Sequence, residues 1–114
     1  MVIVSEAEFA ELVDDELDAL PDEMVEGLDN VVIMIEDEPE DGSDLLGVYE
    51  GLALTERDNY AGVLPDRIVL FRGPLTRMCD DIDDLRDEIH ITLVHEIAHF
   101  YGIEEDQLHA LGWG

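Results

Sequence analysis

The chain has 114 residues, of which 31 are Asp or Glu and only five are Lys or Arg, giving a formal net charge of −26. Such a charge repels nucleic acid and anionic membrane surfaces, so we expect neither as a partner. The length suits one domain, residues 1–114, with one hydrophobic core.

Apolar stretches are too short to cross a membrane, and the N-terminus has no basic segment typical of a signal peptide. Cys79 is the only cysteine, so no intramolecular disulfide can form, which fits a reducing cytoplasm. We expect a cytoplasmic protein with Cys79 buried as a small apolar side chain. The acidity has two interpretations: a surface suited to high salt, or a high-GC genome together with a surface that attracts cationic peptides.

The first 28 residues predict two helices. Ser5 and Glu8 form a capping box, in which each side chain bonds the other residue's amide. Apolar residues follow at helical spacing: Phe9, Leu12, Val13, Leu17 and Leu20. Pro21 stops this helix, and residues 22–28 predict a short second one.

Three strands are predicted, at residues 31–35, 45–54 and 67–71, with an acidic loop over 36–44 and a polar loop over 55–62. The first strand is a continuous β-branched run, which is typical of a strand covered on both faces. Gly47 and Gly51 interrupt the second strand and indicate a bulge or a close backbone approach. The acidic loop contains Pro39 and Gly42, and we expect it to be exposed.

Two further helices are expected, a short one from Pro74 to Met78 and a long one over residues 83–101. Carboxylates at residues 80–84 suit the positive end of the long helix. Its core stripe repeats at helical spacing: Leu85, Ile89, Leu93 and Ile97, broadened by Ile82, Val94 and Ala98.

The long helix ends in the run His95-Glu96-Ile97-Ala98-His99-Phe100-Tyr101-Gly102. Histidines four residues apart lie on one helix face, where both imidazoles can bind one zinc ion. In an HExxH motif the Glu, here Glu96, is the general base for a metal-activated water. Gly102 suits a left-handed turn that would aim a downstream side chain back at the metal.

Three residues are candidates for the third metal ligand. The metzincin layout places a histidine three residues after the glycine, where this chain has Glu105. A carboxylate is an acceptable zinc ligand, so we rank Glu105 first, Asp106 second and His109 third. For His109 a capping or packing role beside Leu108 and Leu111 is the preferred interpretation.

The segment Leu46–Trp113 resembles a family of very small bacterial zincin-like metallopeptidases, related to the Asp-zincins with their HExxHxxGxxD motif. The matching stretches are Gly47–Gly51, Leu64–Ile68, His95–Ile103 and Leu108–Trp113. One departure is Glu105 at the aspartate position of that motif. The resemblance implies an α+β fold of minimal zincin type, a small mixed β-sheet packed on an N-terminal helix and a long active-site helix.

The function so implied is a zinc-dependent metallopeptidase that hydrolyses peptide bonds, with Zn²⁺ on His95, His99 and Glu105 and with Glu96 as general base. A peptide or small protein substrate would lie along the strand at 45–54 by main-chain hydrogen bonds. The equal alternative is an ordinary edge strand in which Tyr49 packs on a neighbour. An alternative is a catalytically weak or inactive zincin-like module that binds metal or peptide. A purely structural zinc site prefers four protein ligands and has no use for Glu96, which favours catalysis. An exposed edge strand would also allow a homodimer.

Several other residues have roles that the sequence leaves open. Five side chains are candidates to stabilise the oxyanion: Tyr49, Arg57, Tyr60, Arg72 and Tyr101. Trp113 suits either an apolar floor under the metal or a core anchor for the end of the chain. His90 is off the ligand face, and we expect a structural role for it.

Overall fold

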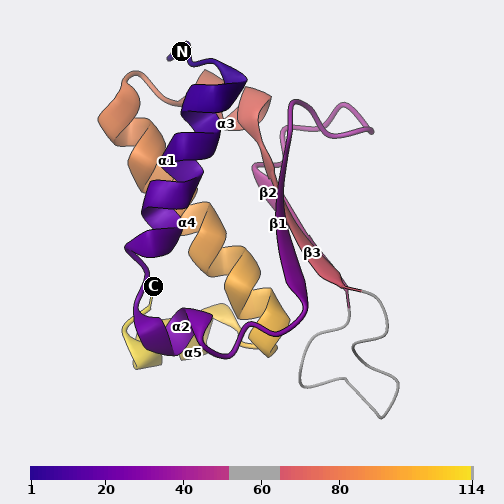
Figure 1. Ribbon diagram of the computed structural model, residues 1–114, viewed down its shortest axis with the longest axis vertical. Coiled ribbons are helices and arrows are strands. Elements are labelled where there is room, and N and C mark those ends of the chain that lie inside the picture. Colours follow the sequence, from indigo (N-terminus) through magenta and orange to yellow (C-terminus); the bar gives the residue numbers. More distant parts are fainter. Residues whose placement is uncertain (52–64, 114) are drawn as a thin grey trace.

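The computed structural model describes residues 1–51 and 65–113. The elements are α1 (Glu6–Asp18), α2 (Asp22–Val25), β1 (Val31–Glu36), β2 (Gly47–Glu50), β3 (Asp66–Phe71), α3 (Arg72–Met78), α4 (Ile82–Tyr101) and α5 (Glu105–Leu111). Figure 1 shows α1 and α4 together beside the sheet, with α2 and α5 near one end of α4 and α3 near the other. The expected α+β class is confirmed. Across the described residues, no helix is both long and apolar enough to cross a membrane.

The sheet has three strands in the order β1-β3-β2, with β1 parallel and β2 antiparallel to β3. The predicted mixed sheet is therefore confirmed, and β3 is the central strand, buried from Ile68 to Phe71. The prediction that residues 31–35 are covered on both faces is wrong. Val32 is 43% exposed, because it points away from the core, as does its exposed partner Arg67 on the central strand, whereas alternate residues such as Ile33 and Ile35 face the core.

The hydrophobic core lies between the sheet and the two long helices. The predicted α4 stripe is confirmed, since Leu85, Ile89, Leu93 and Ile97 are all fully buried. Ile82 does not extend this stripe as predicted, because it is the first residue of α4 and is 37% exposed. Cys79 is buried as expected, and its burial raises the pKa of the thiol.

The N-terminal capping box is confirmed. The Ser5 hydroxyl accepts a hydrogen bond from the Glu8 amide (3.1 Å), and the Glu8 carboxylate accepts one from the Ser5 amide (3.2 Å). α1 ends at Asp18, close to the predicted stop at Pro21. The second helix is shorter than the predicted 22–28, because α2 is a single turn that ends at Val25.

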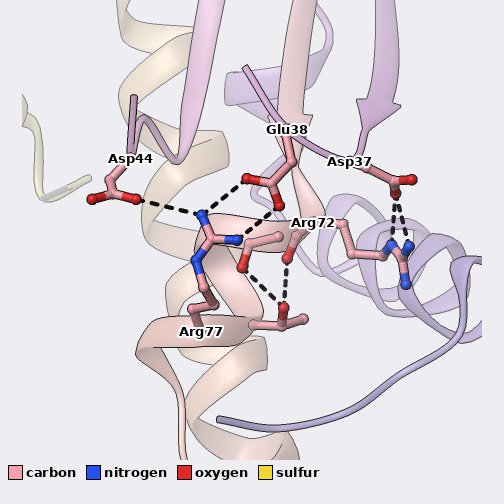
Figure 2. A network of polar contacts seen from close by, with 7 residues as sticks. Asp37, Glu38, Asp44, Arg72 and Arg77 are labelled. Carbon is pink, nitrogen blue, oxygen red and sulfur yellow. Dashed lines mark hydrogen bonds and ion pairs between the residues drawn. The ribbon is translucent and has the colours of Figure 1, made fainter. Parts of the chain in front are cut away.

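The acidic loop after β1 is held against α3 by two arginines (Figure 2). The Arg77 guanidinium donates to both oxygens of Glu38, at 2.7 and 3.0 Å, and also reaches Asp44 at 3.4 Å. Arg72 donates to Asp37 at 2.9 Å. The hydrogen bond from Arg77 lowers the pKa of Glu38. Three carboxylates of the loop thus form ion pairs with α3, although their side chains are exposed as predicted.

All four described arginines are used in such pairs. Each lies within 3.5 Å of a carboxylate: Arg67 of Glu50, Arg72 of Asp37, Arg77 of Glu38, and Arg86 of Asp15. With 31 acidic residues in the chain, most carboxylates have no cation to neutralise them. Mutual repulsion among these carboxylates destabilises the compact state, and dissolved ions screen that repulsion.

Raising NaCl from about 0.05 M to about 1 M shortens the screening length from roughly 14 Å to roughly 3 Å. We expect this change to stabilise the fold by at least about 1 kcal/mol, or roughly 4 °C in Tm, measured by circular dichroism during heating. The control is the same comparison near pH 4, where about half of the carboxylates are protonated and the salt effect should shrink. A Tm that stays flat or falls with salt would contradict a surface suited to high salt.

Candidate metal centre

α4 carries both the core stripe and the candidate ligands on different faces. Asp81 caps its first turn by accepting from the Asp84 amide (2.8 Å), and the helix continues unbroken for 20 residues. Leu93 and Ile97 are buried, whereas His95 and His99 are exposed, and 62% of the His99 side chain faces solvent. Burial of the apolar face fixes the rotation of α4 about its axis. This rotation determines the side of the helix from which both imidazoles project.

The predicted turn at Gly102 is confirmed. Gly102 has φ 72° and ψ 29°, a left-handed conformation that glycine adopts without strain. The amide of Gly102 bonds the His99 carbonyl at 3.1 Å, and the amide of Ile103 bonds the Ala98 carbonyl at 2.9 Å. The chain thereby turns sharply into α5, which lies across the end of α4 in Figure 1.

A hollow of about 350 Å³ lies between the end of α4 and the start of α5. The residues that line it are His95, Ala98, His99, Ile103, Glu104 and Leu108. The structure thus brings the two histidines to one hollow, as the HExxH spacing predicts. Glu104, which also lines this hollow, was missed by the sequence analysis, although it directly precedes Glu105 after the glycine turn.

The three predicted third ligands have different outcomes. Glu105 is the first residue of α5, and its side chain lies outside what the structure describes. Asp106 and His109 are exposed, and neither is among the described residues that line the hollow. Of the capping or packing role expected for His109, the packing part is wrong, because His109 and Leu111 face solvent while Leu108 is 3% exposed. The capping part stays a prediction for a residue in the last turn of α5. Among residues 1–51, 65–104 and 106–113, no group of three or more His, Cys, Asp or Glu is placed to hold a metal ion.

Glu96 lies on a different face of α4 from the histidines and is only 8% exposed. Its Oε1 atom is 2.9 Å from His99 Nδ1. Thr92 and Phe100, one turn before and one turn after Glu96, share its face of the helix and are both buried. Phe100 packs edge-on against the Tyr49 ring of β2, with ring centroids 6.4 Å apart. Glu96 is therefore covered on the side of α4 that faces β2.

In the three-stranded sheet of the described residues, β2 is an edge strand, and it lies close to α4. A Cβ atom on Gly47 would come within 2.7 Å of the Thr92 methyl group and 3.0 Å of the Val69 carbonyl oxygen, so the predicted close backbone approach is confirmed. β2 spans Gly47–Glu50, so it begins two residues later than the predicted 45–54, and the predicted residues 52–54 lie outside the described residues. The predicted loop at 55–62 lies outside the described residues.

The candidate oxyanion residues that the structure describes are engaged elsewhere. The Tyr49 hydroxyl donates to Asp66 Oδ2 at 2.5 Å. The Tyr101 hydroxyl donates to the Met24 carbonyl of α2 at 2.7 Å, and burial raises the pKa of this phenol. Arg72 belongs to α3 and to the network in Figure 2. The other two candidates, Arg57 and Tyr60, lie outside the described residues.

Trp113 anchors the end of the described chain to α2. Its Nε1 donates to Glu23 at 3.2 Å, and its ring lies 5.9 Å from that of Tyr101. Trp113 also lines a second hollow of about 300 Å³, which shares His95 with the first. The anchoring role is therefore observed. His90, which lines this second hollow too, is half-exposed, and its Nδ1 lies 3.9 Å from Glu16.

The profile of a family described as zincin-like metallopeptidases matches residues 28–113, which include the whole sheet, α4 and α5. The chain belongs to this family. A solved structure of a conserved hypothetical protein from Thermus thermophilus is similar, with a TM-score of 0.59 and 25% sequence identity. The similarity covers 95% of this chain and 97% of that one. No curated protein matches the chain significantly.

Proposed function

We propose that this chain is a zinc-dependent metallopeptidase in which His95 and His99 bind the metal and Glu96 is the general base. One observation carries the proposal: the two imidazoles line a single hollow, and the carboxylate between them in sequence is buried on the side of α4 that packs against β2. Membership of the zincin-like metallopeptidase family supports it.

The residues around the hollow suit zinc. Neutral imidazole nitrogens and carboxylate oxygens are its usual ligands, and a catalytic site keeps a position open beside three of them. Glu105 is the proposed third ligand, because it holds the position of the aspartate in the HExxHxxGxxD motif. Glu104 is the alternative, because it lines the hollow with both histidines.

Zinc in this hollow would act as a Lewis acid that polarises a peptide carbonyl and increases the acidity of a water molecule. The protein's own contribution begins with Glu96, whose carboxylate takes a proton from water and returns it to the departing amine. An extended peptide substrate would lie along β2 and bind through main-chain hydrogen bonds. The excess of carboxylates favours a peptide of positive charge.

A second candidate function is a metal- or peptide-binding module with little or no hydrolytic activity. The contact between Glu96 and His99 favours this second candidate, because a carboxylate that is hydrogen-bonded to the imidazole of a metal ligand is less available to accept a proton from water. The two candidates differ in whether bound peptide is cleaved.

The first experiment measures zinc per chain by titration, on the unmodified chain and on single alanine variants of four residues: Glu104, Glu105, Asp106 and His109. We expect one zinc per chain, lost in one variant only, which would identify the third ligand. Peptide hydrolysis should stop when a chelator removes the metal and resume when zinc is restored. No zinc binding at micromolar concentration would overturn the peptidase and leave a peptide-binding module, and one zinc without hydrolysis would leave a metal-binding module.

A further inference from the structure

We propose that Glu96 also positions His99 for the metal, by accepting a hydrogen bond from the Nδ1–H group of that ring. This inference rests on the proposed metal site, because it concerns how one of its two histidines is prepared. Glu96 then has a positioning role in addition to the proton transfer proposed above.

The contact joins the buried side chain of Glu96 to the exposed side chain of His99. Glu96 Oε1 lies 2.9 Å from His99 Nδ1, which is an ordinary hydrogen-bond length. Only 11% of the Glu96 side chain is exposed, whereas 62% of the His99 side chain is exposed. An exposed ring loses rotational freedom when it binds zinc, so a carboxylate that already holds the ring reduces that cost.

The same contact selects which ring nitrogen can bind a metal. A neutral imidazole carries one N–H group and one lone pair, and an ionised carboxylate can only accept a hydrogen bond. With Glu96 at Nδ1, the hydrogen belongs on Nδ1 and the lone pair on Nε2. Histidines that bind metals commonly donate their other ring N–H to such a carboxylate, which fixes tautomer and orientation.

The two histidines differ in this respect. Among the described residues, the structure records this carboxylate contact for His99 and none for His95. A carboxylate has about four lone-pair positions, so a bond through Oε1 leaves Glu96 able to accept a proton from water as well. Positioning and proton transfer therefore use one side chain, and substitutions can separate them.

Zinc affinity separates the two roles. Glu96→Gln keeps an oxygen that can accept from Nδ1–H but removes the general base, whereas Glu96→Ala and Glu96→Leu remove both. We expect the zinc Kd to rise about 10- to 100-fold in the Ala and Leu variants and to change less than about threefold in the Gln variant. The Leu variant keeps the space beside β2 filled, in case the Ala variant does not fold. Glu88→Ala, two helical turns earlier, is the matched control and should leave the Kd unchanged.

A second readout needs no metal. In the metal-free protein, ¹⁵N chemical shifts of the His99 ring should show hydrogen on Nδ1, and this preference should be lost in Glu96→Leu. Equal zinc affinities of the unmodified chain and the Ala and Leu variants would overturn the inference, as would a His99 ring with hydrogen on Nε2. If the unmodified chain binds no zinc, the proposed function fails instead, while the ring shifts still test the contact itself.

Discussion

Replacing His99 by alanine is expected to weaken zinc binding by more than about 100-fold, because the loss of a direct ligand should exceed the 10- to 100-fold typical of a supporting contact. His95→Ala should have an effect of the same size, since both rings line the hollow between α4 and α5. Competition with a chromophoric chelator measures both affinities. The free energy of unfolding should change little in His99→Ala, because 62% of the His99 side chain is exposed to solvent.

The matched control is His90→Ala. His90 lies on the same helix, is half-exposed and does not line the hollow that contains His99. Its removal should leave zinc affinity unchanged. If His99→Ala bound zinc as tightly as the unmodified chain, the metal would have to bind elsewhere, and the assignment of the HExxH face would be wrong.

Leu93→Ala is expected to lower the free energy of unfolding by about 2–5 kcal/mol. Leu93 is fully buried in the middle of α4, and its truncation removes apolar contacts and leaves a cavity. A domain of this size is stable by roughly 5–15 kcal/mol, so one substitution would remove a large part of the total. Urea unfolding followed by circular dichroism measures the change in midpoint.

Ile91→Ala is the matched control for this experiment. Ile91 is two residues away on the same helix but is 44% exposed, so its truncation should cost less than about 1 kcal/mol. Equal losses in the two variants would mean that α4 does not bury its Leu93 face. Both variants keep the two histidines, and zinc affinity can be compared under conditions where each is folded.

Local interactions account for what the sequence predicted well. The capping box at Ser5, the core stripe of α4 and the left-handed turn at Gly102 each depend on residues a few positions apart. The position of β1 depends instead on which strands pair. A β-branched run is compatible with a strand covered on one face or on both, and the exposure of Val32 depends on which face of the sheet the rest of the chain covers, since its partner Arg67 on the central strand is exposed too.

The candidate site divides in the same way. His95, Glu96 and His99 were found from spacing, because a helix brings residues four apart onto one face. Glu104 was missed because its approach to the histidines depends on how α5 folds back after Gly102. The contact from Glu96 to His99 depends on side-chain rotamers and on the cover that β2 provides, which no pattern in the sequence describes.

The division of α4 into a buried face and an exposed face has a consequence for how this family can evolve. Because the imidazoles add little to the core, substitutions can remove them one at a time while the fold persists. A change in helix length is different, since one inserted residue turns everything beyond it by about 100° around the axis. Descendants of such a chain can therefore lose their chemistry through point mutations and survive as stable proteins, whereas insertions within α4 disrupt fold and chemistry together.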